Sequence, residues 1–265
     1  MDITDFKRNK KCWLSVTAIL MLLIAVLGAR PGWYWYQDLT FYQKTRTETE
    51  LKIKAFAEEN GLFYAQYPKS LVQLLERNPE TEAFVLNYPL RKKTDPMPQQ
   101  IEARGAVPLF LQWDQRWGYE KYGSDFLAVT GCGPTCLAMA GYYLTGSEKM
   151  NPGEIAAFAE KNGYYAAGYG SSWTLISQGS QKLGLTATEL PLVKKKITDA
   201  LEAGNPVILA MGAGDFTTTG HYIVLTGYQD GAFTVNDPNS VHNSQELWTY
   251  ERLESQIRNI WEISI

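Results

Sequence analysis

The sequence predicts an α+β fold for residues 106–265, because helical signals dominate the first part of this stretch and strand signals the second. Helix caps and helix stops follow one another between residues 134 and 203, and β-rich runs begin only at Pro206. The chain has 265 residues, of which 45% are hydrophobic, so a domain with a substantial core is expected. An apolar segment and a charged spacer precede this domain.

Residues 1–29 have the pattern of a cytoplasmic basic tail followed by a transmembrane anchor. Four basic side chains precede an uncharged stretch of 18 residues, Cys12–Ala29. As a helix this stretch spans about 27 Å at roughly 1.5 Å per residue, close to the thickness of a bilayer core. Basic residues stay on the cytoplasmic side, so the remainder is expected to be extracytoplasmic. A cleaved signal peptide is the alternative, but the aromatic cluster Trp33–Tyr36 favours an anchor, because such rings gather at membrane interfaces.

Residues 30–105 are interpreted as a helical stalk or spacer that ends in a linker. The charged stretch from Gln37 to Asn60 has helical character, and Gly61 follows it as a helix stop. Two short helices are expected next, over Pro68–Arg77 and over residues 78–86. These helices either dock onto the main domain or act as a small pro-segment. The proline-broken charged run at the end of this region has the composition of a linker.

Capping and stop residues define four helices in residues 106–265. The first begins at Pro134, and the others are expected over residues 151–163, 172–183 and 197–203. Three short β-rich runs follow, at Pro206–Met211, Tyr222–Tyr228 and Ala232–Asn236. Residues 229–231 join the last two runs as a β-hairpin.

Composition argues against several classes of protein. A net charge of −3, with no basic stripe interleaved with aromatic residues beyond the first residues, argues against nucleic-acid binding. Three cysteines are too few for a disulfide scaffold. A zinc site from Cys132, Cys136, His221 and His242 is disfavoured, because both cysteines would lie on one helix and the second half offers no clear ligand pair. No feature indicates a cofactor or an oligomeric state.

The run GCGPTCLAMA at Gly131–Ala140 places Cys132 where a tight turn meets the start of a helix. Unpaired N–H groups and the positive end of the helix dipole stabilise a negatively charged sulfur, the form that attacks a carbonyl carbon. Such a nucleophile needs a base, and the chain has only two histidines. His221 starts an apolar strand, whereas His242 lies in a polar loop with nothing nearby to fix its ring. His221 is therefore the predicted base.

The residue that orients His221 depends on the register of the hairpin. With a two-residue turn over Asp230-Gly231, Asn236 shares the face of His221. A three-residue loop moves the pairing by one residue, and Asp237 takes that place. Either side chain can accept the imidazole N–H, so this argument leaves a Cys/His/Asp and a Cys/His/Asn arrangement open.

Three runs in this order, GCGPTCLAMA, GHYIVLTGY and NDPN, resemble the papain-like cysteine peptidases of the C-39-like branch, which includes bacteriocin-leader-processing domains and free-standing relatives. In those relatives the nucleophile is the first cysteine of a CG run that opens a helix, the base is a histidine at a strand start, and an Asp follows later. Cys132, His221 and Asp237 match these positions, with 16 residues from the histidine to the aspartate. The resemblance covers residues 107–265 and implies a papain-like fold.

The resemblance also implies a role for an upstream glutamine and distinguishes the two neighbouring cysteines. Family members use a glutamine amide as an oxyanion donor; compact members carry it six residues before the cysteine, where this chain has Phe126. Gln112, in an opening similar to that of the free-standing relatives, is the predicted donor, and Gln115 is the second choice. Cys136, one turn into the helix, is expected to be a small buried side chain.

Taken together, the N-terminal pattern and the resemblance predict a membrane-anchored, extracytoplasmic bacterial cysteine peptidase. It would hydrolyse peptide bonds of a peptide or protein substrate through the triad Cys132, His221 and Asp237, with a thioester acyl-enzyme and with Gln112 at the oxyanion. Two alternatives remain: an amidase that acts on cell-wall muropeptides with the same triad, and a binding module of the same fold without turnover.

Overall fold

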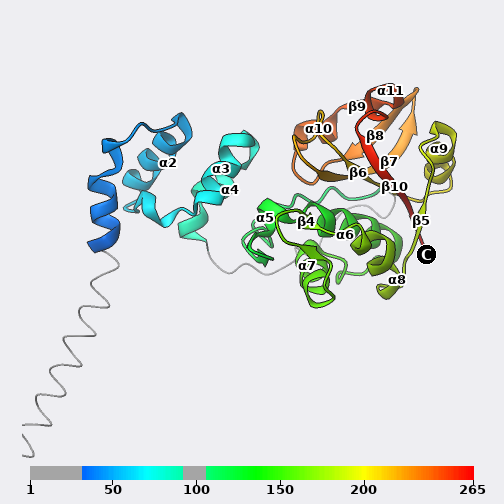
Figure 1. The fold of residues 1–265 in the computed structure, drawn as a ribbon, viewed down its shortest axis with the longest axis horizontal. Coiled ribbons are helices and arrows are strands. Elements are labelled where there is room, and N and C mark those ends of the chain that lie inside the picture. Colours follow the sequence, from blue (N-terminus) through cyan, green and yellow to red (C-terminus); the bar gives the residue numbers. More distant parts are fainter. Residues whose placement is uncertain (1–31, 92–105) are drawn as a thin grey trace, which may run out of the picture. The chain divides into compact units, whose positions relative to one another are not determined.

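The computed structural model describes residues 32–91 and 106–265, whose fold is drawn in Figure 1. The described residues form two compact units, which are divided in the sequence between Val72 and Gln73. Helix α3 (Lys69–Arg77) runs across this division. The unit before the division is helical, and the unit after it combines helices with a six-stranded sheet.

The unit that ends at Val72 consists of helical segments: a helix over residues 32–39, η1 (Phe41–Gln43), α2 (Glu48–Glu59) and η2 (Tyr64–Gln66). Helix α2 begins with a capping box, in which the side chains of Thr47 and Glu50 accept each other's backbone N–H. The helical character predicted for this polar stretch is therefore confirmed. No helix within 32–91 or 106–265 has the length and apolarity to cross a membrane, and the span predicted at residues 12–29 lies outside these ranges.

The second unit starts with residues that the sequence assigns to the spacer. Asn78 caps η3 (Pro79–Thr81), which leads into α4 (Glu82–Leu86) and η4 (Tyr88–Leu90). The ring of Phe84 stacks on Tyr119 with 4.2 Å between ring centres, and the Tyr119 hydroxyl donates to the Phe84 carbonyl oxygen at 2.7 Å. Residues 73–90 therefore dock onto the domain formed by residues 106–265.

Two helices dominate the first half of this domain, α6 (Cys132–Thr145) and α7 (Pro152–Lys161). Asn151 caps α7 by accepting the N–H of Glu154 at 3.0 Å, as its sequence signature predicts. The other two predicted helices are also present, the third as a π-helical segment continued by a short α-helix. The remaining helices are α5 (Leu127–Thr130), η5 (Leu175–Gly179), α8 (Ser180–Lys182), α9 (Lys194–Glu202), α10 (Val241–Gln245) and α11 (Tyr250–Leu253).

A six-stranded antiparallel sheet forms the second half, in the order β5-β10-β6-β7-β8-β9. The three predicted runs are present as β6 (Val207–Met211), β7 (His221–Gln229) and β8 (Ala232–Asn236). The other three strands were not predicted. Edge strands β5 and β9 are short and mostly exposed and carry little apolar pattern, and the buried residues of β10 do not alternate strictly along the strand. The missed strands are β5 (Thr186–Glu189), β9 (Leu247–Thr249) and β10 (Ile257–Ser264).

Two small hairpins lie outside this sheet and belong to the helical half of the domain. They consist of β1 (Lys121–Tyr122) with β2 (Asp125–Phe126), and of β3 (Tyr165–Ala166) with β4 (Gly170–Ser171). β4 packs against the start of α6. The hairpins therefore add short strands beside the helix that carries Cys132.

Helices cover both faces of the sheet (Figure 1). Side chains alternate along the central strands, so that Ile208 and Val224 pack in the cluster with α6 and α7, whereas Leu209 and Ile223 pack in the cluster with α9. The predicted combination of helices with an antiparallel sheet is confirmed. Strand β7 runs between the two apolar clusters, and its first residue is His221.

The start of α6 packs tightly against β4. Cys132 is the first residue of the helix, two positions before the predicted start at Pro134. A Cβ atom added at Gly133 would lie 2.6 Å from Ser171 Oγ and 2.7 Å from Ser171 Cβ, closer than unstrained contacts allow. Glycine at this position therefore lets β4 approach the turn that holds Cys132.

Replacing Gly133 with alanine should lower the free energy of unfolding by about 1–3 kcal/mol, because the added methyl group overpacks the contact with Ser171. Urea unfolding of the wild type and the variant measures the difference. Adding Ser171→Gly to the Gly133→Ala variant removes the opposing Cβ, and this double variant is expected to recover part of the lost stability. A double variant that loses the full sum of the two single effects would contradict this contact.

Candidate active site

Cys132 occupies the first position of α6, and its side chain is partly exposed. The first backbone N–H groups of a helix have no intrahelical partner, so this helix end offers hydrogen-bond donors and a positive dipole near the thiol. Cys136, one turn further along, is fully buried, and burial raises the pKa of its thiol. The expectation of a buried Cys136 is confirmed, and of the two thiols only Cys132 is open to a substrate.

His221 is buried at the start of β7, where it pairs with Met211 of β6. Its Nε2 lies 2.7 Å from Oδ1 of Asp237, so the other ring nitrogen, Nδ1, is not used by this contact. Burial lowers the pKa of the imidazole, but the charge and hydrogen bond of Asp237, together with the Cys132 side chain, outweigh burial and raise this pKa above its usual range. The surroundings of His221 therefore favour the protonated ring.

The hairpin between β7 and β8 has the two-residue turn. Gln229 pairs with Ala232, and the two residues between them, Asp230 and Gly231, have φ angles of 50° and 83°. Positive φ at both central positions is the geometry of the turn type that matches the twist of two antiparallel strands. With this turn, an unbroken ladder would place Asn236 on the face of the base.

A β-bulge changes that outcome. The pairing shifts by one residue at Thr226, so that Asn236 lies opposite Val224. The next residue, Asp237, consequently reaches the face of β7 that carries His221, and the hydrogen bond between the two side chains forms there. The expectation that a two-residue turn selects Asn236 is therefore wrong, because it assumed an unbroken ladder.

The carboxylate of Asp237 is almost fully buried and is held from three sides. Oδ1 accepts from His221 Nε2 and from the N–H of Asn239 at 2.8 Å, and Oδ2 accepts from Asn243 Nδ2 at 2.8 Å. The N–H of Asp237 donates to Ser244 Oγ at 2.9 Å. These bonds fix the direction of the carboxylate. The polar loop is visible in the sequence, but the roles of Asn239, Asn243 and Ser244 become apparent only in the folded loop.

The segment that opens the domain passes beside this loop. The side-chain Nδ2 of Asn236 donates to the carbonyl oxygens of residues 107 and 108, both at 3.0 Å, so Asn236 fastens this segment instead of orienting the imidazole. Further along, the backbone N–H of Gln112 donates to the carbonyl oxygen of Pro238 at 2.8 Å. Residues 107–112 are thereby tied to the residues that surround Asp237.

Gln112 is buried and lines the same cavity as Cys132. Its Nε2 donates to the carbonyl oxygen of Ala128 at 2.7 Å, and its Oε1 has no hydrogen-bond partner among the residues that the structure describes. An amide nitrogen carries two N–H bonds, so one remains beyond the bond to Ala128. Gln115, the second choice, is exposed and does not line this cavity. The structure thus brings Gln112, and not Gln115, to the site.

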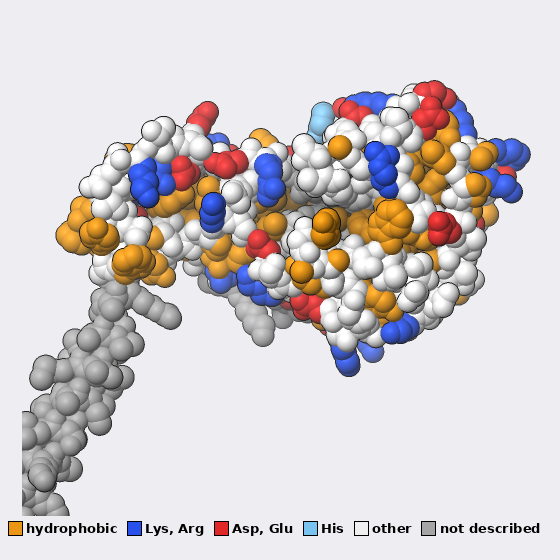
Figure 2. All heavy atoms as spheres, viewed as in Figure 1, with side chains coloured by type: hydrophobic (Ala, Val, Ile, Leu, Met, Phe, Trp, Pro, Cys, Tyr) orange, Lys and Arg blue, Asp and Glu red, His pale blue; other side chains and the backbone are white. Residues whose placement is uncertain are grey.

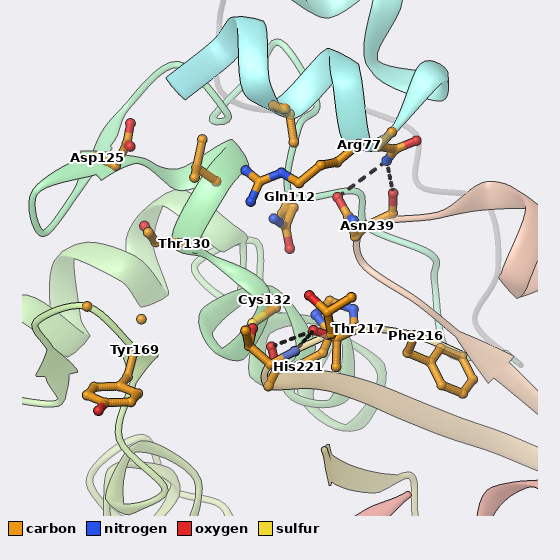
Figure 3. Close-up of a pocket in the computed structure, with 18 of the residues that line it drawn as sticks. Arg77, Gln112, Asp125, Thr130, Cys132, Tyr169, Phe216, Thr217, His221 and Asn239 are labelled. Carbon is orange, nitrogen blue, oxygen red and sulfur yellow. Dashed lines mark hydrogen bonds between the residues drawn. The ribbon is translucent and has the colours of Figure 1, made fainter. Parts of the chain in front are cut away.

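Two cavities meet at Cys132 and His221. One has a volume of about 620 Å³ and includes Gln112 and Tyr169 in its wall. The other has a volume of about 500 Å³ and is also bordered by Trp173. Figure 3 shows Gln112, Cys132 and His221 around one space in the first cavity. The thiol and the imidazole therefore lie at the junction of the two cavities, where an extended ligand could occupy both.

Other candidate ligands and charges lie apart from this cluster. Residues 32–91 and 106–265 contain no group of three or more His, Cys, Asp or Glu side chains placed to hold a metal ion. His242, part of the zinc alternative, is largely exposed, with Nε2 at 3.2 Å from Glu246 Oε1, and lines neither cavity. On the face drawn in Figure 2, acidic and basic side chains are interspersed.

A cysteine at a helix start, beside a strand-borne histidine with a side-chain hydrogen-bond partner, is the arrangement of the papain-like class. Residues 105–264 match the Peptidase_C39 like family, and the chain belongs to that family. The resemblance noted in the sequence is thereby confirmed. A search of curated proteins finds no significant match.

Two solved structures are similar to parts of the chain. One is the peptidase domain of Streptococcus ComA, described as a bi-functional ABC transporter involved in a quorum-sensing pathway; it is 23% identical, with a TM-score of 0.38, over 51% of this chain and 89% of that one. The other is a protein from Bacillus anthracis described as a C39-like peptidase; it is 17% identical, with a TM-score of 0.36, over 59% of this chain and 94% of that one.

The raised pKa of His221 predicts that its ring stays protonated above pH 6.5, its ordinary midpoint. Asp237→Asn should lower this pKa, because it removes the charge that outweighs burial. Nitrogen-15 NMR titration of histidine-labelled protein measures both midpoints, and His242→Ala assigns the two ring signals. Equal midpoints in the wild type and Asp237→Asn would contradict the prediction.

The same shift predicts how stability depends on pH. Because the pKa of His221 is higher in the folded than in the unfolded chain, the protonated ring stabilises the fold fully below pH 6.5, and this contribution disappears as the pH rises through the folded value. The free energy of unfolding should therefore decline with alkaline pH more steeply in the wild type than in Asp237→Asn.

Proposed function

We propose that this protein is a cysteine peptidase that hydrolyses peptide bonds of a peptide or protein substrate. Cys132 is the nucleophile, His221 the acid and base, and Asp237 the residue that orients His221. The observation that carries the proposal is the 2.7 Å bond between buried His221 and Asp237, beside an accessible cysteine at a helix start. Membership of the Peptidase_C39 like family supports peptidase chemistry.

In the first half of the reaction, Sγ of Cys132, with its proton on His221, forms a bond to the scissile carbonyl carbon. The carbonyl π electrons move to oxygen and give a tetrahedral oxyanion. As the oxyanion collapses, the C–N bond breaks and His221 gives its proton to the leaving amine. A thioester between Cys132 and the acyl part of the substrate remains.

In the second half, His221 takes a proton from a water molecule, whose oxygen attacks the thioester carbon. The C–S bond then breaks, the carboxylic acid leaves, and the proton returns to the Cys132 and His221 pair. The net change is the addition of one water across the peptide bond. Asp237 keeps its charge throughout and stabilises the imidazolium that forms in both halves.

The oxyanion needs hydrogen-bond donors that point at it during both halves. We assign this role to the backbone N–H of Cys132, at the free end of α6, and to the side-chain amide of Gln112. Burial of Gln112 in the wall of the Cys132 cavity and its bond to Ala128 support the assignment, because they restrict the amide to one place near the nucleophile.

The proposed location is the outer side of the cell membrane, with residues 12–29 as the anchor. Support comes from the sequence: basic side chains precede the uncharged stretch, and an aromatic cluster follows it. Determining the N-terminal residue of the mature protein distinguishes an anchor from a cleaved signal peptide. A chain that begins after residue 29 would mean secretion instead.

Cys132→Ala should abolish hydrolysis of a peptide library while the chain still folds, because it removes the only accessible thiol at the site. The assay compares wild type, Cys132→Ala and the control Cys136→Ala, each with labelling by a peptidyl chloromethyl ketone. Equal labelling of wild type and Cys132→Ala would contradict the assignment.

Cleavage of muropeptides but not of the peptide library would favour the amidase alternative, and turnover of neither would favour the binding module.

Gln112→Ala should reduce kcat by about 10²- to 10³-fold through loss of one oxyanion donor, with little change in KM. Gln115→Ala is the matched control, because Gln115 is exposed and lies outside the cavity. Steady-state kinetics on a peptide that the wild type cleaves measure both variants. A kcat for Gln112→Ala equal to that of Gln115→Ala would exclude Gln112 from the oxyanion site.

A further inference from the structure

Residues 78–80 precede the part of the chain that matches the family, yet they form hydrogen bonds to the loop that follows Asp237. The sequence leaves two roles open for this region, a segment docked on the domain and a small pro-segment. A pro-segment would restrain the site, whereas a docked segment could complete it. The contacts made by Glu80 and Asn78 distinguish these roles.

Glu80 binds the start of α10 with both carboxylate oxygens. Oε1 accepts from Ser240 Oγ at 2.6 Å and from the N–H of His242 at 3.3 Å, and Oε2 accepts from the N–H of Val241 at 2.7 Å. These N–H groups belong to the first turn of the helix, which has no acceptors of its own for them. A carboxylate at a helix N-terminus is also favoured by the helix dipole. Glu80 thus fixes where α10 begins.

Asn78 makes a second link from the same segment. Its Nδ2 donates to the carbonyl oxygen of Asn239 at 2.6 Å, while its Oδ1 accepts the N–H of Glu80 at 3.0 Å. One buried amide therefore holds the loop with one end and caps its own short helix with the other. Both ends of the amide are satisfied, so the segment and the loop have a defined mutual position.

Asn239, which Asn78 holds, also holds the Asp237 carboxylate, and the residues that Glu80 holds follow it directly in the chain. Asn239 donates its N–H to Asp237 Oδ1, and Ser240 donates its N–H to the Asp237 carbonyl oxygen at 3.2 Å. Within α10, Asn243 donates to Asp237 Oδ2. A shift of α10 or of Asn239 would therefore turn the carboxylate relative to His221.

We propose that Glu80 is a positioning residue, which holds the loop 237–241 and α10 so that Asp237 stays aligned with His221. Residues 78–86 are accordingly an integral part of the catalytic domain and not an inhibitory pro-segment. The proposal deepens the proposed peptidase function and rests on it. Glu80 itself lines neither cavity at Cys132, so it acts through the loop and not through contact with substrate.

Loss of this support has a measurable effect at His221. When Asp237 moves away, burial of the imidazole is no longer outweighed, and the pKa of His221 falls. A neutral imidazole no longer stabilises a charged Cys132 sulfur, so the thiol reacts more slowly. Both effects can be followed without any peptide substrate.

The test uses the full chain and alkylation of Cys132 by iodoacetamide at neutral pH, followed site by site with mass spectrometry. Glu80→Ala should slow the reaction by about tenfold or more, because a neutral imidazole no longer favours the reactive form of the thiol. The pKa of His221, measured by NMR, should fall in the same variant. Glu148→Gln, which removes one exposed carboxylate away from the site, is the control for loss of charge.

A rate within about twofold of wild type, an equal effect of Glu148→Gln, or an unchanged pKa of His221 would overturn the proposal. A faster reaction would also overturn it, since release of an inhibitory segment exposes the thiol. If Glu80→Ala does not fold, Glu80→Gln takes its place; its amide keeps one acceptor oxygen and must lose at least one of the three bonds, so slower alkylation is still expected.

Asn78→Asp separates the loop contact from the helix cap. An aspartate keeps the oxygen that accepts the Glu80 N–H but cannot donate to Asn239. It should slow alkylation of Cys132 although the cap remains, and an unchanged rate would count against the proposal.

Because the readouts need no peptide, a wild type that alkylates as expected but cleaves neither peptides nor muropeptides would overturn the proposed function and not the positioning role.

Discussion

The structure of the site depends on one buried hydrogen bond, between the imidazole of His221 and the carboxylate of Asp237. Both side chains are removed from water, where an unpaired carboxylate would be strongly destabilised. Each satisfies the other, but the carboxylate has further lone pairs, and the loop after it supplies N–H donors for them. The amide of Asn243 follows from this requirement, since an apolar side chain there would leave one oxygen of the buried charge without this partner.

Holding that pair beside Cys132 requires segments that are far apart in the sequence to meet. The cysteine comes from the helical half, where Gly133 allows β4 to pack against the helix start. The histidine comes from a central strand whose two faces are covered by separate apolar clusters. Residues 107–112 and residues 78–80 then fasten the loop from two more directions. The cluster therefore belongs to the whole domain, although only a few side chains take part in the chemistry.

The sequence predicts those features that short stretches encode. Cys132 and His221 are recognisable from the residues around them, and the central strands from their apolar runs. Asp237 could not be separated from Asn236 by turn chemistry, because a bulge leaves no clear signature in the sequence. The edge strands have too few buried residues to show a period. Glu80 and Ser240 are 160 residues apart, and no local pattern indicates that they meet.

The bulge at Thr226 also bears on how such a site could change over time. Side chains in a strand alternate between faces, so the choice between bulging a residue and pairing it exchanges the neighbours that each face presents. Because Thr226 is bulged, a charged carboxylate meets the imidazole; if Thr226 were paired in the ladder, a neutral amide would take that place. In this hairpin, absorbing the bulge into the ladder would be chemically equivalent to exchanging the third member of a triad, with no substitution at the site itself. Backbone pairing is here a determinant of electrostatics.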